Sequence, residues 1–160
     1  NEPLVTTRRQ RWQLWWWTRK MSRKLRAQLP SHVRIVVSDC YHPAWWSGRI
    51  GNNTLDIHHY QCFSDTDNQA TSLTHHRQVL DQQSSKYRGY ARQQPLIIGE
   101  WSAALPPRTA SDSNEYTHCQ SQLTVPSGVD AWFYWSYKTE NPGAWNFRDC
   151  YTKGWFDGMY

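Results

Sequence analysis

The sequence lacks several features that assign a chain to a large class of proteins. No apolar run approaches the roughly 20 residues that a membrane span needs, and no signal peptide is visible. The cysteines show no C-x-x-C spacing, which argues against a zinc ribbon. There is also no internal repeat, no Gly-rich phosphate loop and no G-x-S-x-G elbow. These absences exclude P-loop nucleotide binding, elbow-type hydrolases and repeat architectures.

Aliphatic residues are scarce, whereas aromatic residues are abundant. The chain is only 38% hydrophobic but contains 11 Trp and 9 Tyr. Such a composition suits a protein that stacks flat ligands or sugar rings, although Trp can also fill a core. The 160 residues are enough for one modest domain, and we treat 1–160 as a single unit.

Positive charge is concentrated in one segment. The net charge is +5, but eight basic residues with no acid between them lie within Arg8–Arg26, and the rest of the chain has 10 basic and 13 acidic residues, a net of −3. This segment also contains Trp15-Trp16-Trp17. One interpretation is a basic-aromatic surface for nucleic acid or membranes. We favour an amphipathic helix that packs on a sheet, because apolar residues recur at spacings of three and four. These residues are Leu14, Trp17, Met21, Leu25 and Leu29.

The predicted elements alternate between strands and helices. Helices are expected at Arg8–Leu29, which Pro30 ends, and at Thr71–Tyr90. Strands are expected at Val33–Asp39, Leu55–Phe63, Leu96–Glu100 and Ala131–Tyr137. Tyr41 to Trp46 is expected to be an aromatic loop, and Pro106 to Gly128 a long loop without a helix. This order predicts an α/β fold, either a barrel or a doubly wound sheet.

Polar and aromatic residues follow the predicted strands at their carboxyl ends, where chemistry gathers in an α/β barrel. These residues are Glu2, His58, Tyr60, Glu100 and Trp135. Two carboxylates at different strand ends suit glycosidic bond cleavage, in which one acid protonates the leaving oxygen and the other attacks the anomeric carbon. A Trp would supply a flat floor for a sugar ring. These residues could instead have purely structural roles. Glu100 would then form an ion pair with an arginine, and the aromatic side chains would fill the core.

The histidines and cysteines leave other possibilities open. His58 and His59 with His75 and His76 could bind a metal, but their carboxylate neighbours argue for another role, so we expect no metal and no cofactor.

Cysteines at 40, 62, 119 and 150 allow three pairings if all are oxidised. A glycosylation sequon at 52–54 would matter only in a secreted protein.

Four motifs resemble glycoside hydrolase family 5, and most of all its fungal exo-β-1,3-glucanases. They are Asn1-Glu2-Pro3, His58-His59-Tyr60, the run Ile98-Gly99-Glu100-Trp101-Ser102, and the run from Phe133 to Glu140. The motifs occur in the family's order, and the similarity covers most of the chain after about Val33. The family fold is a (β/α)₈ barrel without a metal or organic cofactor. Eight strands need roughly 250 residues, so the resemblance implies the C-terminal half of a barrel, about four strands, truncated at the N-terminus.

The resemblance also implies roles for individual residues. Glu2 would be the general acid/base and Glu100 the nucleophile, with Asn1 on the sugar 2-hydroxyl. His58 and Tyr60 would hold the nucleophile and substrate, Trp135 would be the sugar platform, and Phe63 would belong to an entrance clamp. These assignments imply a retaining hydrolase of β-1,3-glucan located outside the cell or in the cell wall.

The chain departs from the family pattern in three ways. The family's first strands are absent, so we expect an incomplete or divergent copy. The 160 residues alone are expected to hydrolyse β-glucan more slowly than the family does and to self-associate through the open barrel edge. The segment Arg8–Arg26 is far more basic and Trp-rich than the family's helix. The family's helix between the nucleophile strand and the last strand is expected to be deleted near 119–125, and Cys119 matches a disulfide cysteine whose usual partner is missing. Two alternatives therefore remain: a non-catalytic carbohydrate-binding remnant and a basic-aromatic polyanion binder.

Overall fold

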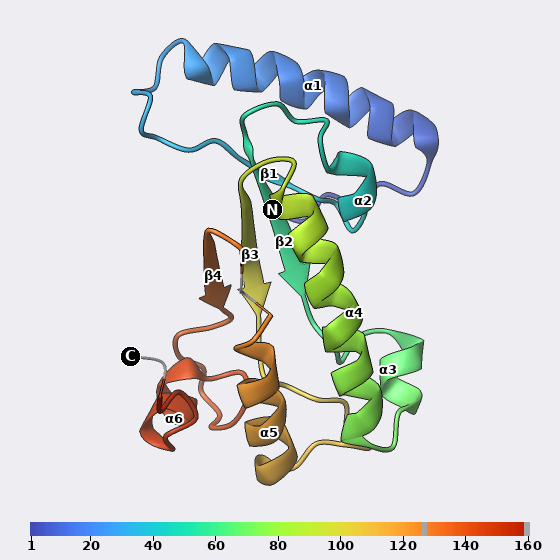
Figure 1. The fold of residues 1–160 in the computed structure, drawn as a ribbon, viewed down its shortest axis with the longest axis vertical. Helices are drawn as coiled ribbons and strands as arrows, with labels where there is room; N and C mark the ends of the chain where they lie inside the picture. Colours follow the sequence, from blue (N-terminus) through green and yellow to red (C-terminus); the bar gives the residue numbers. More distant parts are fainter. Residues whose placement is uncertain (126–127, 159–160) are drawn as a thin grey trace.

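The computed structural model describes residues 1–125 and 128–158. Figure 1 shows four strands with helices arranged around them and the long helix α1 crossing one end of the molecule. The strands are β1 (Val36–Ser38), β2 (Thr54–His59), β3 (Leu96–Trp101) and β4 (Ala131–Tyr134). The helices are α1 (Arg8–Arg26), α2 (Pro43–Trp46), α3 (Asp65–Gln69), α4 (Leu73–Ala91), α5 (Asp112–Gln122) and α6 (Phe147–Thr152).

The four strands form one parallel sheet whose spatial order is the order of the chain, β1-β2-β3-β4. Parallel strands are normally covered on both faces and are therefore rich in apolar residues. Leu55 and Ile57 on β2 and Leu96 and Ile98 on β3 are almost fully buried and form the centre of the core. The predicted α/β class is confirmed. A doubly wound sheet reverses its strand order at a switch point, and the described strands show no such reversal.

All four strands are present where the sequence predicts them; β1, β2 and β4 are shorter than predicted, whereas β3 extends one residue further, to Trp101. The chain after Ser38, His59 and Tyr134 leaves the sheet earlier than the apolar pattern suggests. The residues beyond these points form the loops at the carboxyl ends of the strands, which we call the carboxyl edge of the sheet. Because all strands are parallel, these loops meet at one edge, which is where the candidate site lies.

Helix α1 begins where predicted and ends at Arg26, three residues before the expected end. A reciprocal capping box fixes its start, since Thr7 Oγ1 accepts from the Gln10 amide at 3.2 Å and Gln10 Oε1 accepts from the Thr7 amide at 3.0 Å. The predicted buried stripe is only partly correct. Leu14 and Met21 are half-buried, but Trp17 and Leu25 are exposed. Trp15 packs inward instead, and its indole N–H donates to the Arg49 carbonyl at 2.8 Å.

The expectation of a long loop from Pro106 to Gly128 is wrong, because it contains α5. Ser111 caps this helix by accepting from the Asn114 amide at 3.2 Å. The side chains that α5 buries are His118, Cys119 and Gln122, two of which are polar, so the usual apolar periodicity is missing. The apparent deletion near 119–125 is therefore also wrong. Helix α5 lies beside α4 (Figure 1).

The cysteines are all free thiols in this structure, so none of the three pairings is formed. Burial raises the pKa of Cys119 to about 12, and the nearby Cys150 adds to this shift. Among residues 1–125 and 128–158, no helix combines the length and the apolar character that crossing a bilayer requires.

Candidate active site

The two candidate carboxylates meet at the carboxyl edge of the sheet. Glu100 lies on β3 in register with His58 on β2, and the N-terminal segment brings Glu2 to the same place. One carboxylate oxygen of Glu2, one of Glu100 and one ring nitrogen of His58 lie within 4.8 Å of one another. Residues nearly 100 positions apart in the sequence therefore share one cluster.

Both oxygens of Glu100 accept a hydrogen bond from a neutral donor. The side-chain Nδ2 of Asn1 donates to Oε1 and the Tyr60 hydroxyl donates to Oε2, each at 2.8 Å. The Glu100 side chain is largely buried, at 11% exposure. Two donors, one on each oxygen, fix the orientation of the carboxylate. Because both donors are neutral, they stabilise its negative charge without neutralising it.

Glu2 is more open and is held by one strong contact. Its Oε1 lies 2.6 Å from His58 Nδ1, and its side chain is 37% exposed. This hydrogen bond is the main reason that the pKa of Glu2 lies below its usual value, with a smaller contribution from Tyr41. Glu2 is therefore ionised in the resting structure at neutral pH.

His58 connects three carboxylates. Its Nδ1 faces Glu2 and lies 3.5 Å from Glu100 Oε2, while its Nε2 lies 3.5 Å from Asp56 Oδ2. Burial lowers the pKa of His58, but the hydrogen bonds to Asp56 and Glu2 outweigh it and raise the pKa to about 9. A protonated imidazole thus neutralises part of the negative charge that the two glutamates and Asp56 bring together.

Asp56 is a site residue that the sequence argument missed. Its Oδ2 faces His58, and its Oδ1 is buried without a hydrogen-bond partner among the described residues. A Cβ placed on Gly99 would lie 1.9 Å from Oδ1. The glycine before Glu100 therefore leaves room for a carboxylate on the neighbouring strand. The available signal was the pair of Asp56 and His58, which alternate on one strand and so point to the same face.

Three aromatic rings form a wall beside Glu100. The ring centroids of Tyr60 and Phe63 are 5.3 Å apart, those of Tyr60 and Trp145 are 5.6 Å apart, and those of Phe63 and Trp145 are 5.9 Å apart. Phe63 is 67% exposed, as a residue at an entrance would be. Trp145 was not among the predicted residues, because no local pattern distinguishes it from the other tryptophans.

Trp135 is the one predicted residue that is not joined to this cluster. It follows β4, its amide donates to the Trp101 carbonyl at 2.7 Å, and its side chain is 52% exposed. Its role as a sugar platform stays a prediction. The structure brings together Asn1, Glu2, His58, Tyr60, Phe63 and Glu100.

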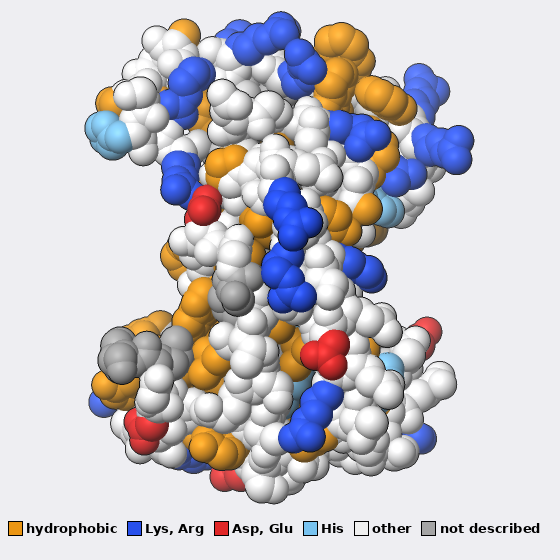
Figure 2. Space-filling view, in the orientation of Figure 1, with side chains coloured by type: hydrophobic (Ala, Val, Ile, Leu, Met, Phe, Trp, Pro, Cys, Tyr) orange, Lys and Arg blue, Asp and Glu red, His pale blue; other side chains and the backbone are white. Residues whose placement is uncertain are grey.

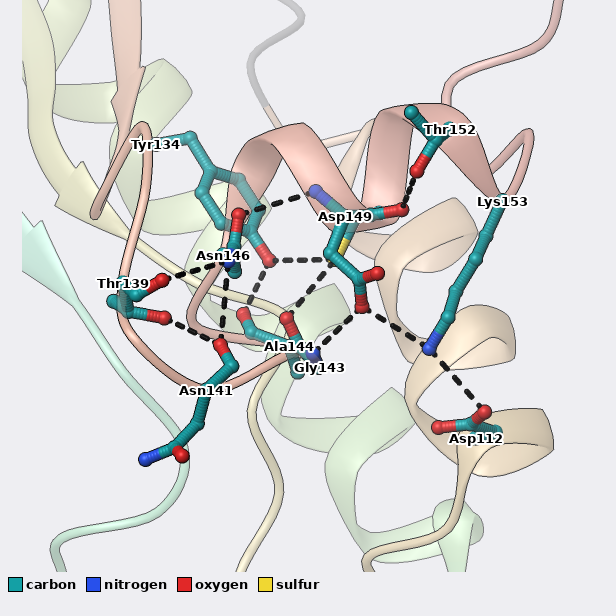
Figure 3. A network of polar contacts seen from close by, with 11 residues as sticks. Asp112, Tyr134, Thr139, Asn141, Gly143, Ala144, Asn146, Asp149, Thr152 and Lys153 are labelled. Atoms are coloured by element: carbon teal, nitrogen blue, oxygen red, sulfur yellow. Dashed lines mark hydrogen bonds and ion pairs between the residues drawn. The ribbon is translucent and has the colours of Figure 1, made fainter.

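A polar network fixes the loop that carries Trp145 (Figure 3). Asn146 Nδ2 donates to the carbonyls of Thr139 and Asn141, each at 3.2 Å. Asp149 accepts from the Gly143 amide at 2.7 Å and pairs with Lys153 at 3.1 Å. The amide hydrogen bond from Gly143 is the main reason that the pKa of Asp149 is lowered. The aromatic wall therefore rests on a loop with its own internal support.

Within the described part of the chain, two groups of side chains have the spacing to hold a metal ion. One is the cluster of Glu2, His58 and Glu100, and the other is Asp67 with His75 and His76. His75 and His76 belong to the second group and His58 belongs to the first. The site of four histidines that the sequence left open is therefore not formed. In the first group His58 is already bonded to Glu2, which favours proton chemistry over metal binding.

Comparison with known proteins points to fungal glucan-hydrolysing enzymes. The chain is 23% identical over 170 residues to the probable glucan 1,3-beta-glucosidase A of Neosartorya fischeri, with 81% of this chain and 40% of that protein covered. It is 26% identical to the probable glucan 1,3-beta-glucosidase of Arthroderma benhamiae (86% and 44% covered). It is 28% identical to the glucan 1,3-beta-glucosidase of Yarrowia lipolytica (68% and 34% covered).

The matches cover only part of each relative. The chain spans roughly 40% of the length of the first of these relatives. No protein-family model matches it. The chain is thus similar, at low identity, to glucan 1,3-beta-glucosidases.

Proposed function

We propose that this chain forms the active-site end of a retaining hydrolase of β-1,3-glucan. The observation that carries the proposal is the approach of Glu2 and Glu100, whose nearest oxygens lie within 4.8 Å of each other. In retaining glycosidases the two carboxyl groups are about 5–5.5 Å apart, whereas inverting enzymes need a wider gap for a water molecule. The similarity to glucan 1,3-beta-glucosidases supports β-1,3-glucan as the substrate.

Glu100 is the proposed nucleophile. Its carboxylate would attack the anomeric carbon and form a glycosyl ester while the leaving oxygen takes up a proton. Its position suits this role, since it is buried, oriented by Asn1 and Tyr60, and adjacent to the aromatic wall. Asn1 is also proposed to contact the 2-hydroxyl of the sugar, and Trp135 to line the sugar site.

Glu2 is the proposed acid/base, and its contact with His58 limits the pH range in which it can act as an acid. A general acid must be protonated when the substrate is bound, but the hydrogen bond from His58 keeps the Glu2 pKa low. Substrates with poor leaving groups should therefore be cleaved faster as the pH falls toward the pKa of Glu2. Activated aryl glucosides need little protonation and should not show this increase.

We further propose that the four sequential parallel strands are part of a (β/α)₈ barrel, as in family 5 glycoside hydrolases. The strand order without reversal and the site at the carboxyl edge both support this. An extracellular or cell-wall location follows from a glucan substrate and is part of the proposal.

Covalent trapping tests the proposal directly. A 2-deoxy-2-fluoroglucoside with a good leaving group should add one fluoroglucosyl unit to Glu100, detectable by peptide mass spectrometry. The fluorine slows hydrolysis of the ester, and the good leaving group removes the need for Glu2. Glu100→Gln should not be labelled, and Glu2→Gln should still be labelled.

A non-catalytic carbohydrate-binding role is the second candidate. The aromatic wall of Tyr60, Phe63 and Trp145 favours it, because such a surface can hold a sugar without chemistry. Binding of laminarin without labelling or turnover would support this role and contradict the hydrolase.

A further inference from the structure

A groove lined by arginines lies between α1 and the segments 31–35 and 49–53, away from the candidate active site. Its volume is about 580 Å³, and none of its lining residues is acidic. Five arginines line it: Arg19, Arg23, Arg26, Arg34 and Arg49. We call it the arginine groove. Figure 2 shows Lys and Arg side chains gathered over the end of the molecule that α1 occupies.

Neutral groups hold three of these arginines in place. The Arg26 guanidinium donates to the carbonyls of Pro30 at 3.1 Å and Val33 at 2.5 Å. The Arg19 guanidinium lies over the Trp15 ring at 4.7 Å, and that of Arg49 lies over another indole, Trp45, at 5.5 Å. Carbonyls and indoles orient a guanidinium without cancelling its charge.

Acidic compensation within the groove is small. Arg34 pairs with Asp130 at 2.6 Å, but the two side chains are 58% and 39% exposed, where an ion pair contributes little. In the described part of the chain, no ion pair involves Arg19, Arg23, Arg26 or Arg49. The groove therefore presents a largely uncompensated positive charge in a fixed arrangement.

We propose that the arginine groove binds an acidic polysaccharide, meaning a chain of sugars that bears carboxylate or sulfate groups. Guanidinium groups pair in a bidentate manner with planar or tetrahedral oxyanions. Hydroxyl and amide side chains of Ser22, Asn52 and Asn53 also line the groove and can bond sugar hydroxyls. This inference does not depend on the proposed glucan hydrolysis.

A nucleic acid fits the groove less well than an acidic sugar chain. Proteins that bind single-stranded nucleic acid stack the bases on aromatic rings, and no aromatic residue lines this groove. The indoles of Trp15 and Trp45 lie nearby, and each already has a guanidinium group over its ring, from Arg19 and Arg49 respectively. The groove thus offers charge and hydrogen-bond donors but no stacking surface.

Binding of dextran sulfate, with uncharged dextran as the matched polymer, tests the proposal. The full 160-residue chain is produced without N-linked glycans, because Asn52 of the sequon lines the groove. We expect binding to dextran sulfate that weakens steeply with salt, as counterion release requires, and no binding to dextran. Equal binding to both polymers would overturn the proposal.

Paired variants of α1 test the location. Arg19→Gln/Arg23→Gln removes two groove charges, whereas Lys20→Gln/Lys24→Gln removes two charges of the same helix that do not line the groove. We expect the arginine pair to lose roughly tenfold or more in affinity and to lower the salt slope by about 2, since each lost contact lowers it by about 1. The lysine pair should lose less than about threefold.

Three results would contradict the proposal. Equal losses in both pairs would show a diffuse charge effect. Tighter binding of a DNA oligonucleotide than of dextran sulfate at the same salt would assign the groove to nucleic acid. If the arginine pair does not fold by circular dichroism, Arg23→Lys replaces it. That variant keeps the charge but loses the bidentate fork, so unchanged affinity would count against guanidinium recognition.

Discussion

At the scale of single residues, the absence of a side chain at Gly99 matters as much as the side chains around it. Gly99 is not in a left-handed conformation, so its freedom of φ is not what the site needs. The need is space, because the Asp56 carboxylate occupies the volume where a Cβ would lie. This places Asp56 against His58 and, through His58, beside both glutamates.

Gly99→Ala should therefore destabilise the chain by about 1–3 kcal/mol, the usual cost of overpacking. Gly89→Ala is the matched control, because a Cβ there meets no atom within 4 Å and alanine favours a helix. Urea denaturation measures both. In the double variant Asp56→Ala/Gly99→Ala the clash is gone, so the two changes should be strongly non-additive. Simple additivity would show that the two positions do not compete for space.

His58 makes stability depend on pH in a defined direction. Its pKa is about 9 in the folded chain, above the ordinary value of 6.5, because Asp56 and Glu2 favour the cation. The stabilisation is complete below about pH 6.5 and is lost as the pH rises through about 9. Glu2, whose pKa is lowered, contributes stability above pH 4.5 that is lost on acidification.

The free energy of unfolding should therefore fall between pH 6 and pH 9.5, as measured by urea titration at each pH. His58→Gln removes the titrating group and should abolish most of this decrease. A decrease of the same size in the variant would assign the pH dependence to other groups.

At this scale the sequence predicted the two glutamates and their partners Asn1, His58 and Tyr60, and the structure places all five together. Asp56 and Trp145 could not be predicted in the same way. The role of Asp56 depends on an empty volume across the sheet, and that of Trp145 depends on how a loop folds back. Neither the empty volume nor the loop path has a local pattern, and the alternation of Asp56 with His58 indicates only that the two share a strand face.

At the scale of secondary structure, apolar periodicity predicted the four strands and the long helices α1 and α4 but missed the shorter helices. Among these, α2 lies in the segment expected to be an aromatic loop and is too short to show a periodicity, and α5 buries mainly polar side chains. Strands β1, β2 and β3 and helix α4 bury apolar side chains, and β4 half-buries Trp132 and Tyr134. Helix α5 buries His118 and Gln122, which bond each other at 3.0 Å. Its helical signal was instead the cap, since Ser111 precedes Asp112 and Glu115 in the first turn.

The Ser111 cap should be measurable. Ser111→Ala leaves the Asn114 amide without its side-chain acceptor, and we expect a loss of about 1 kcal/mol in the free energy of unfolding. Ser113→Ala is the matched control, because its hydroxyl is exposed and bonds only the Ser111 hydroxyl among the described residues. Chemical denaturation with an unchanged m-value measures the difference, and equal losses would contradict a capping role.

At the scale of the whole molecule, the sheet has two strands with a free edge. Among the described residues, β1 pairs only with β2, and β4 pairs only with β3. Val36 on β1 and Phe133 on β4 are 48% and 54% exposed. Unpaired edges with exposed apolar side chains favour pairing with another chain.

Residues 1–160 produced alone should therefore self-associate at micromolar concentration. Val36→Lys places a charge on the free edge of β1 and should shift the population toward monomer in sedimentation velocity. Gln28→Lys adds the same charge at an exposed position outside the sheet. A monomeric unmodified chain, or an equal effect of both variants, would contradict association through this edge.

The separation of charge along the molecule determines how it orients on a charged surface. Eight positive charges lie in α1 at one end, and the rest of the chain carries a net charge of −3. The protein is therefore a strong electric dipole as well as a weak net cation. It should adsorb to a cation exchanger with the α1 end first, and should still be retained near pH 9.1, where the sequence pI predicts no net charge. Immobilised in this way, the molecule would present the end opposite α1 to the solution.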